Sequence, residues 1–508
     1  MNFRTPATPL RRAIGRGFAV FAIAALGLLR ATGVHAAPGD PDLTFGTNGR
    51  VAALFSGVAN SRVGGMLIQP DGIIVVAGGC GLTTEVICVA RRLPSGAPDP
   101  DFGTQGTVVT TDQIASVGTA AHFVMQQGGK LVVAGTCSPR LFCAIRLSSN
   151  GTRDTTFGTN GKVVITNRIS VATTGAFAQQ RDGKLVFAGP CNSAEHCVAR
   201  IDANGSIDSS FGVGGVVVVA TPAEVQGGSI SSVAVNEQAD GKLVLSGACT
   251  LLAAAPLPQA QAPCAFRLQS NGAPDLSYGS NGFASARISA DASFYAGAAV
   301  AQLDDAIVVG ARCGASNTKS CIARFDKGGR FDSNLQTFAA PADFSLISAL
   351  ALQNDGKILA AGNCTAADAG GRICFLRYNA DGSLDASLPA VVDTTPASSA
   401  SSVATQSDGK IVVAGSYSLG GNQLVSLNRY EGGPFANSAC SLDIDGDGIV
   451  NPAIDGVILT RATMGFSGPN VYAGITFATN ATRKQWGTGG SDDIRKFLVS
   501  QCGMKLPL

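Results

Sequence analysis

The 508-residue sequence predicts an all-β fold, a seven-bladed β-propeller of four-stranded blades closed by the N-terminal strand, with a small α-helical calcium-loop domain at the C-terminus. Three observations predict the propeller. A Gln-x-Asp-Gly turn, or a close variant of it, recurs seven times at intervals of 51 to 64 residues. The repeat unit holds four short apolar segments separated by Gly, Asp, Asn or Ser, and no helical period crosses the region. Four-stranded units that repeat without intervening helices are typical of propellers.

The first 36 residues have the pattern of a secretory signal. A basic segment precedes an apolar run from Gly17 to Leu29, and Val34-His35-Ala36 is a small-residue cleavage site. The run is too short to span a bilayer, and no later segment is long enough, so we expect no transmembrane anchor. We therefore expect a signal peptide over residues 1–36, a propeller over 37–435 and a calcium module over 436–508. The predicted destination is the periplasm, the cell surface or the surroundings of the cell.

The charge of the mature chain argues against a nucleic-acid binder. The signal carries five arginines and no acid, so its removal changes the formal net charge from +2 to about −3. A nucleic-acid-binding domain is expected to have the opposite sign. Only two histidines, His122 and His196, follow the signal, too few for an imidazole-based metal site.

Two motifs alternate along the repeats. The turns begin at Gln69, Gln126, Gln180, Gln238, Gln302, Gln353 and Gln406. Between them lie seven copies of an Asp-x-x-Phe-Gly-type turn, with aspartates at Asp42, Asp99, Asp154, Asp208, Asp275, Asp332 and Asp385; the last two copies have lost the Phe-Gly pair. The Asp-Gly of the first motif predicts a tight hairpin between two strands, because both residues tolerate positive φ.

The two ends of the repeat region predict a closed ring. The chain enters with a strand segment between Asp42 and Phe55, and no corresponding strand follows Arg429. The N-terminal strand is thus expected to complete the seventh blade, which removes unpaired sheet edges.

Twelve of the fourteen cysteines fall into neighbouring pairs, one in each of the first six blades. In an exported chain, such pairs across a hairpin most simply form disulfides, each worth about 2 to 3 kcal/mol. The expected bonds are Cys80–Cys88, Cys137–Cys143, Cys191–Cys197, Cys249–Cys264, Cys313–Cys321 and Cys364–Cys374, placed between the third and fourth strands of each unit.

An arginine recurs in every blade, three residues after the second cysteine in the first six. The seven are Arg91, Arg146, Arg200, Arg267, Arg324, Arg377 and Arg429. A guanidinium buried between blades needs a carboxylate partner, and the aspartate of the Asp-x-x-Phe-Gly motif or of the Asp-Gly turn could supply it. The alternative is a ring of arginines that faces the channel and binds an anion.

The combined motifs, for example QRDGKLVFAG at Gln180 followed by RIDANGSIDSSFGVGG at Arg200, resemble the delta-60 repeat family of largely exported bacterial proteins. The resemblance covers about residues 40 to 430. It implies a propeller-type repeat and no established reaction.

The chain changes character after Gly433, where LDIDGDGIVNPAIDG predicts a calcium loop. Acidic residues at alternating positions around a glycine bend suit an ion with six to eight oxygen ligands. The expected ligands are Asp443, Asp445, Asp447, the carbonyl of Ile449, Asn451 and Asp455, with Asp455 in place of the usual acid one position earlier.

The C-terminal segment resembles a dockerin-like or EF-hand-like half-motif, in which the ion caps a helix. A second amphipathic helix is expected after Ser491 as N-cap, without a second acidic loop. A disulfide between Cys440 and Cys502 would enclose this module and stabilise it by about 4 kcal/mol.

Catalysis finds little support in the motifs. The only tryptophan, Trp486, lies outside the repeats, so sialidase-type and quinoprotein-type signatures are missing, and no nucleophile elbow is evident. We therefore expect a non-enzymatic scaffold or recognition protein, monomeric, with a protein or glycan partner and a structural calcium ion. The alternative is a hydrolase or lyase acting on a carbohydrate or peptide with carboxylates at the channel mouth, for which the inserts Leu251 to Pro263 and Ser280 to Ala301 are the places to look.

Overall fold

The computed structural model describes most of the chain beyond the predicted signal. The described residues are 36–55, 60–81, 86–113, 122–137, 140–166, 175–192, 195–227, 230–254, 257–288, 293–314, 319–333, 344–365, 371–395, 398–432, 444–447, 451–488, 493–500 and 506. The predicted signal peptide therefore lies outside the described residues, apart from Ala36.

Residues 41–430 form seven antiparallel sheets, the blades, with the strand nearest the channel first in each blade. Blade 1 has β2 (Arg62–Ile68), β3 (Ile74–Cys80), β4 (Val86–Arg92) and β5 (Thr107–Gln113). Blade 2 has β6 (His122–Met125), β7 (Leu131–Cys137), β8 (Leu141–Leu147) and β9 (Lys162–Val164). Blade 3 has β10 (Ala176–Gln179), β11 (Leu185–Cys191), β12 (Glu195–Ile201) and β13 (Val216–Val219). Blade 4 has β14 (Ser231–Glu237), β15 (Leu243–Leu251), β16 (Ala260–Leu268) and β17 (Phe283–Ser285).

The remaining blades follow the same order. Blade 5 has β18 (Ser293–Ala301), β19 (Ile307–Gly314) and β20 (Lys319–Phe325) as its three strands among the described residues. Blade 6 has β21 (Phe344–Leu352), β22 (Ile358–Thr365), β23 (Gly371–Tyr378) and β24 (Val391–Val392). Blade 7 has β25 (Ser398–Thr405), β26 (Ile411–Leu419), β27 (Asn422–Tyr430) and, as its outer strand, β1 (Arg50–Val51).

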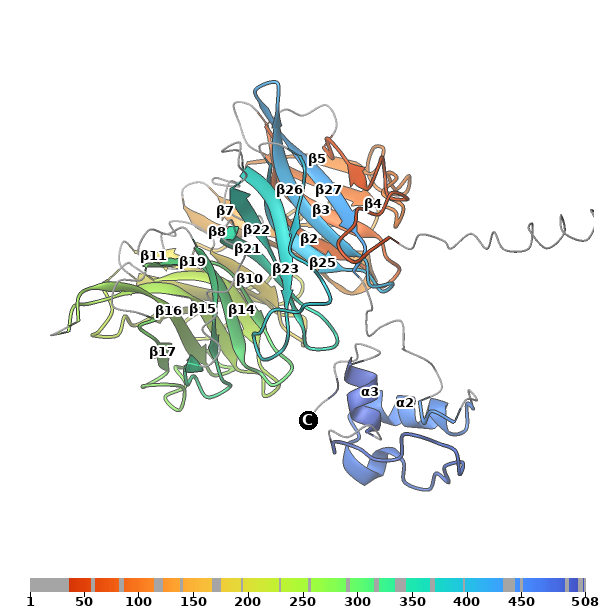
Figure 1. Cartoon of the computed structure of the whole chain (residues 1–508). Helices are drawn as coiled ribbons and strands as arrows, with labels where there is room; N and C mark the ends of the chain where they lie inside the picture. Colours follow the sequence, from red (N-terminus) through yellow and green to blue (C-terminus); the bar gives the residue numbers. More distant parts are fainter. Residues whose placement is uncertain are drawn as a thin grey trace, which may run out of the picture. The chain divides into compact units, whose positions relative to one another are not determined.

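The pairing of β1 with β27 confirms the predicted closure. Arg50 lies opposite Asn428 and Val51 opposite Leu427 in antiparallel register. Figure 1 shows the blue strands β26 and β27 beside the red and orange strands of blade 1, where the two ends of the propeller meet. The strand that closes the ring is two residues long and lies within the predicted segment from Asp42 to Phe55.

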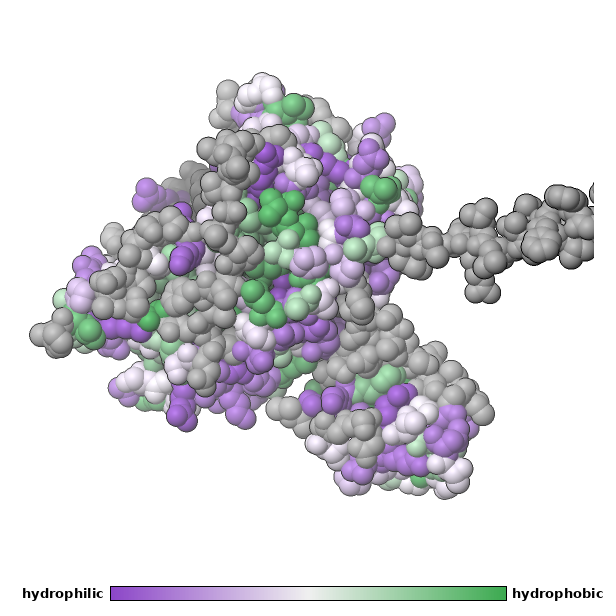
Figure 2. All heavy atoms as spheres, viewed as in Figure 1, coloured by the Kyte–Doolittle hydropathy of each residue, from purple (hydrophilic) through white to green (hydrophobic). Residues whose placement is uncertain are grey.

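The hydrophobic core lies between the blades. Seven clusters of buried side chains fill the seven spaces between neighbouring blades. Alternate residues of one strand enter two different clusters: Val132 and Ala134 pack towards blade 3, and Leu131 and Val133 towards blade 1. Because both faces of a blade are covered, β3 and β7 are buried along their whole length. Figure 2 shows that the outer surface in view is largely polar at the periphery of the propeller.

All six predicted disulfides within the propeller are present, with Cα–Cα distances of 5.8 to 6.0 Å. Each joins the second and third strands of its blade, not the third and fourth. The difference arises because each sequence repeat begins with the outer strand of the preceding blade, as β9 (Lys162–Val164) shows.

The C-terminal residues form a small helical unit around its own core. Helices α2 (Asp455–Thr463) and α3 (Ile494–Ser500) and the short 3-10 helix η4 (Gly468–Val471) surround buried side chains such as Ile458 and Leu498. The carboxylate of Asp493 accepts the backbone N–H of Lys496 at 3.1 Å, so Asp493 caps α3. The predicted cap, Ser491, lies outside the described residues, as do Cys440 and Cys502. Among the described residues, no helix is long and apolar enough to cross a membrane.

Candidate functional site

The recurring arginines and aspartates form seven ion pairs, one in each blade. Each arginine lies on the third strand, and its carboxylate partner follows eight residues later, or near the N-terminus in blade 7. The nitrogen–oxygen distances are 2.6 to 3.2 Å in Arg91–Asp99, Arg146–Asp154, Arg200–Asp208, Arg267–Asp275, Arg324–Asp332, Arg377–Asp385 and Arg429–Asp42. The predicted pairing with the Asp-x-x-Phe-Gly aspartate is confirmed, and the alternative of a channel-facing anion site is wrong.

The Gln-x-Asp-Gly turn contributes two further members to this cluster. The side-chain oxygen Oε1 of Gln126 accepts a hydrogen bond from Arg146 at 2.9 Å, and blades 3 to 7 repeat this contact. The lysine after the turn joins the same aspartate, as in Lys130–Asp154 at 2.8 Å. The polar side chains of the two motifs therefore form hydrogen bonds and ion pairs with one another.

These clusters also connect each blade to the next. Arg146 donates to the carbonyl of Ala203 in blade 3 at 2.7 Å, and Arg267 donates to that of Lys327 in blade 5 at 2.5 Å. Where the motif keeps its aromatic residue, the ring lies under the guanidinium, as Phe211 does under Arg200 at 4.4 Å. The role of the repeated charges is thus to hold the blades in register.

The carboxylates in these clusters have depressed pKa values. Burial raises the pKa of Asp275, but hydrogen bonds from Ser277 and Lys242 and the charge of Arg267 outweigh it and lower the pKa to about 2. Asp42, Asp154 and Asp385 have pKa values held well below the usual range by the same kinds of contact against the effect of burial.

The two faces of the propeller differ in how far they repeat. We call the side with the Gln-x-Asp-Gly turns and the ion-pair clusters the turn face, and the side with the hairpins between the second and third strands the disulfide face. On the disulfide face, the disulfide-bonded cysteines are separated by 6 residues in blade 2 and by 15 in blade 4. Blade 7 has a Gly420-Gly421 turn there and no disulfide. The turn face is nearly uniform, whereas the disulfide face varies from blade to blade.

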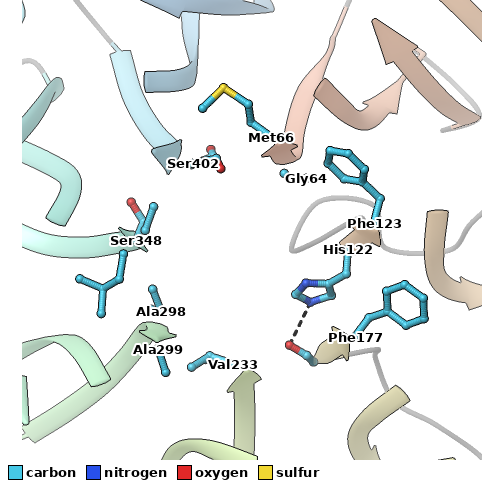
Figure 3. A pocket seen from close by; sticks show the side chains of 16 residues that line it. Gly64, Met66, His122, Phe123, Phe177, Val233, Ala298, Ala299, Ser348 and Ser402 are labelled. Atoms are coloured by element: carbon cyan, nitrogen blue, oxygen red, sulfur yellow. Dashed lines mark hydrogen bonds between the residues drawn. The ribbon is translucent and has the colours of Figure 1, made fainter. Parts of the chain in front are cut away.

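The central channel contains a cavity of about 300 Å³ lined by residues of all seven innermost strands. Figure 3 shows Met66 and Ser402 near each other at the top of the cavity. His122, Phe123 and Phe177 lie on its right, and Ser348 and Ala298 on its left. None of the lining residues is Asp, Glu, Lys or Arg. The described residues that line this cavity therefore include no charged side chain.

His122 is the one titratable side chain among the described residues that line the cavity. Its Nε2 atom lies 3.0 Å from the carbonyl oxygen of Gly175 in the next blade. Burial lowers the pKa of the imidazole to about 4, against the opposing effect of that hydrogen bond. The ring is therefore neutral at neutral pH. Because a carbonyl can only accept, Nε2 carries the proton and Nδ1 is left as an acceptor.

The described part of the predicted calcium loop is held by Asp455. Its Oδ1 accepts the N–H groups of Ile444 and Asp445 at 2.6 and 3.1 Å, and its Oδ2 accepts that of Asn451 at 2.7 Å. The N–H of Asp447 donates to Asp445 at 3.2 Å. Asp455 thus ties both ends of the loop to the start of α2, and a carboxylate oxygen with one hydrogen bond keeps a lone pair for an ion.

Two of the predicted calcium ligands, Asp443 and Ile449, lie outside the described residues. Within the described residues, no group of three or more His, Cys, Asp and Glu side chains is placed to hold a metal. Calcium binding stays a prediction.

The sequence pointed to two inserts, and one of them reaches the channel. Leu251 to Pro263 lengthens the hairpin of β15 and β16 on the disulfide face, outside the cavity lining. The segment from Ser280 to Ala301 includes β18, of which Gly297, Ala298 and Ala299 line the cavity. The other lining residues could not be predicted, because the sequence of an innermost strand does not distinguish it from the other strands of a blade.

Comparison with known proteins supports the propeller. Residues 126–157, 180–211, 353–388 and 406–431, which span the middle strands of blades 2, 3, 6 and 7, match a family model described as a domain of unknown function (DUF5122) beta-propeller. No curated protein matches the chain.

Several solved structures are similar to this chain. A protein of unknown function from Dyadobacter fermentans is 12% identical, with 75% of this chain and 97% of that chain covered, at a TM-score of 0.42. A polysaccharide lyase described as an ulvan lyase is 8% identical, with 76% and 96% covered, at 0.44. A Trypanosoma rangeli sialidase is 12% identical, with 74% and 55% covered, at 0.36. The chain is a seven-bladed β-propeller whose repeats are similar to a β-propeller family.

Proposed function

We propose that this protein is an exported, non-enzymatic propeller scaffold that recognises a protein or a glycan. The observation that carries the proposal is the difference between the two faces. On the turn face the repeated charges pair with one another, whereas on the disulfide face the hairpins differ in length. Variable loops on a rigid frame are the usual arrangement of a binding surface.

Export is supported by the cysteines. All twelve cysteines among the described residues are paired in disulfides. Such bonds form and persist in oxidising compartments. Together with the predicted signal, they favour a periplasmic, cell-surface or extracellular location.

The recognition function is tested with glycan and peptide arrays probed with the mature, disulfide-intact chain. A variant in which the hairpin between Cys249 and Cys264 is shortened to the length of the Cys137–Cys143 hairpin keeps the disulfide and changes only the disulfide face. We expect this variant to bind the selected ligand more weakly. The matched control is Asp71→Ala, in an exposed turn on the opposite face. Failure of the chain to bind any ligand on either array would contradict the proposal.

The same arrays separate the scaffold from an enzyme. A hydrolase or lyase would shorten the captured carbohydrate or peptide, which mass spectrometry of the eluted ligand detects. A scaffold returns it intact.

Calcium is proposed as a structural ion of the C-terminal unit. The proposal is supported by the spacing of Asp443, Asp445 and Asp447 and by the position of Asp455 at the start of α2. Calorimetric titration of the full chain should show calcium binding, and Asp445→Ala or Asp447→Ala should abolish it. Asp381→Ala, in an exposed turn of blade 6, is the control. If both loop variants give the same binding heats as the wild type, the predicted loop does not bind calcium.

A further inference from the structure

Ten of the sixteen residues that line the cavity are Gly, Ala or Ser, whose small side chains leave main-chain atoms accessible. The strands β2, β6, β10, β14, β18, β21 and β25 are each the last strand of their sheet on the channel side. An edge strand presents N–H and C=O groups that no neighbouring strand occupies. Seven such edges surround one cavity, so donors and acceptors are spread around its whole perimeter.

Five of the seven innermost strands have an irregularity at the cavity. The pairing register shifts at Gly64, Val233, Gly297, Ser348 and Ser401, and all five residues line the cavity. A β-bulge leaves its extra residue outside the ladder of strand pairing, and bulges are concentrated beside binding sites. Bulges at one level of so many innermost strands increase the number of main-chain polar groups that face the channel.

The side chains around this ring are uncharged but not purely apolar. His122 offers Nδ1 as an acceptor, and Ser348 donates its hydroxyl to the carbonyl of Ala400 at 2.7 Å, which leaves the oxygen as an acceptor. Met66 and Phe123 add apolar surface and are partly exposed. A charged ligand would lose its hydration here without gaining a countercharge.

We propose that the channel binds one neutral, hydroxyl-bearing sugar ring, the end of a glycan chain. This inference rests on the proposed recognition function and specifies its ligand. A sugar ring carries hydroxyls around its rim, which match donors and acceptors on all sides, and C–H surface that packs against Met66 and Phe123. A cavity of about 300 Å³ is at the small end of ligand sites and holds a single ring, not a longer chain.

An extended peptide fits the same cavity less well. A peptide that adds to a sheet edge pairs with one strand on each side at most, which leaves most of the seven edges without a partner. The glycan end is the ligand that uses the full perimeter.

The inference is tested by calorimetry on the full mature chain with oligosaccharides that end in a neutral hexose. Matched oligosaccharides that end in a uronic acid serve as the charged probe. Ala298→Leu fills the cavity without removing a hydrogen bond, and we expect it to weaken binding at least about tenfold. His122→Phe removes one hydrogen-bonding group and should weaken binding about three- to tenfold. Ala97→Leu makes the same change as the first variant at an exposed site outside the channel and should bind normally. Thermal unfolding shows whether each variant is folded.

The outcomes separate this inference from the proposed function. A neutral glycan that binds the wild type and Ala97→Leu but not Ala298→Leu supports the channel site. If the arrays select a peptide or an acidic glycan, or if a neutral glycan binds Ala298→Leu as well as the wild type, recognition stands and the channel site is wrong. If no array ligand binds, both are wrong.

Discussion

The guanidinium of Arg429 lies 2.7 Å from the carboxylate of Asp42, although the two residues are 387 positions apart in the chain. Both side chains are buried, and Lys410 contacts the same carboxylate at 2.8 Å. In the other blades the equivalent pair is local in sequence. In blade 7 it joins the beginning of the propeller to its end, beside the two-residue strand β1.

Asp42→Asn should open the ring at this position. It leaves the buried charge of Arg429 without its partner, which costs about 3 to 5 kcal/mol. We expect a loss of this size in the free energy of unfolding, measured by chemical denaturation. Hydrogen exchange should increase in β1 and β27. Asp208→Asn is the matched control, since it breaks a local pair and should leave exchange in β1 unchanged; equal exchange in the two variants would contradict a special role for the Asp42 pair.

The stability of the protein should fall as the pH drops from about 6.5 to about 4, and His196 should contribute to this loss beside His122. The side chain of His196 is fully buried, and burial lowers its pKa to about 4. The unfolded chain binds a proton near pH 6.5 and the folded one only near pH 4, so acid favours unfolding, by about 3 kcal/mol at most from this group. Unfolding free energies measured between pH 7 and pH 4 should show the loss in the wild type, and a smaller loss in His196→Gln. An identical pH profile in the variant would exclude His196 as a cause.

A second loss of stability is expected at lower pH from the aspartate clusters. The pKa of Asp275 is about 2 in the folded protein, against 3.8 for an aspartate without these contacts. Its stabilising effect is therefore complete above about pH 4 and disappears as the pH falls towards 2. Asp275→Asn should be less stable than the wild type at pH 7 and should lose less on acidification. Denaturation curves at the two pH values check this expectation.

Disulfide removal should cost more in blade 4 than in blade 2. The chain-entropy model assigns about 3 kcal/mol to the Cys249–Cys264 bond, whose cysteines are 15 residues apart in sequence. It assigns less to the Cys137–Cys143 bond, whose cysteines are 6 residues apart. Double alanine variants at each pair, compared by chemical denaturation under non-reducing conditions, measure the difference. A larger loss for the blade 2 pair would indicate native-state strain or packing in place of chain entropy.

The repeated parts of the fold were predictable because periodicity reveals them. Seven aspartates and seven arginines at matching positions indicate a pairing that one copy could not, and the missing strand after Arg429 indicates closure. The predicted position of the disulfides within the blade was wrong by one strand, since the repeat unit and the blade begin at different strands. Such an offset cannot be seen in the sequence of a circular structure.

The channel was not predictable in the same way. Its character depends on where bulges fall, as at Gly64 and Ser348, and a bulge has no sequence signature in a strand of small residues. The orientation of His122 towards Gly175 is set by contacts between blades. In the C-terminal helix, the cap is Asp493, whose carboxylate also accepts the N–H of Gly487, a contact that requires the fold of the preceding loop.

The outer strand of blade 7 is supplied by Arg50 and Val51, whereas its other three strands come from the last part of the propeller. The first of these segments has no strand partner until the chain as far as Tyr430 has been made and has reached the compartment in which the domain folds. A copy truncated at any earlier point keeps unpaired sheet edges, which expose it to aggregation. The ring can therefore close only in a copy that contains the whole domain.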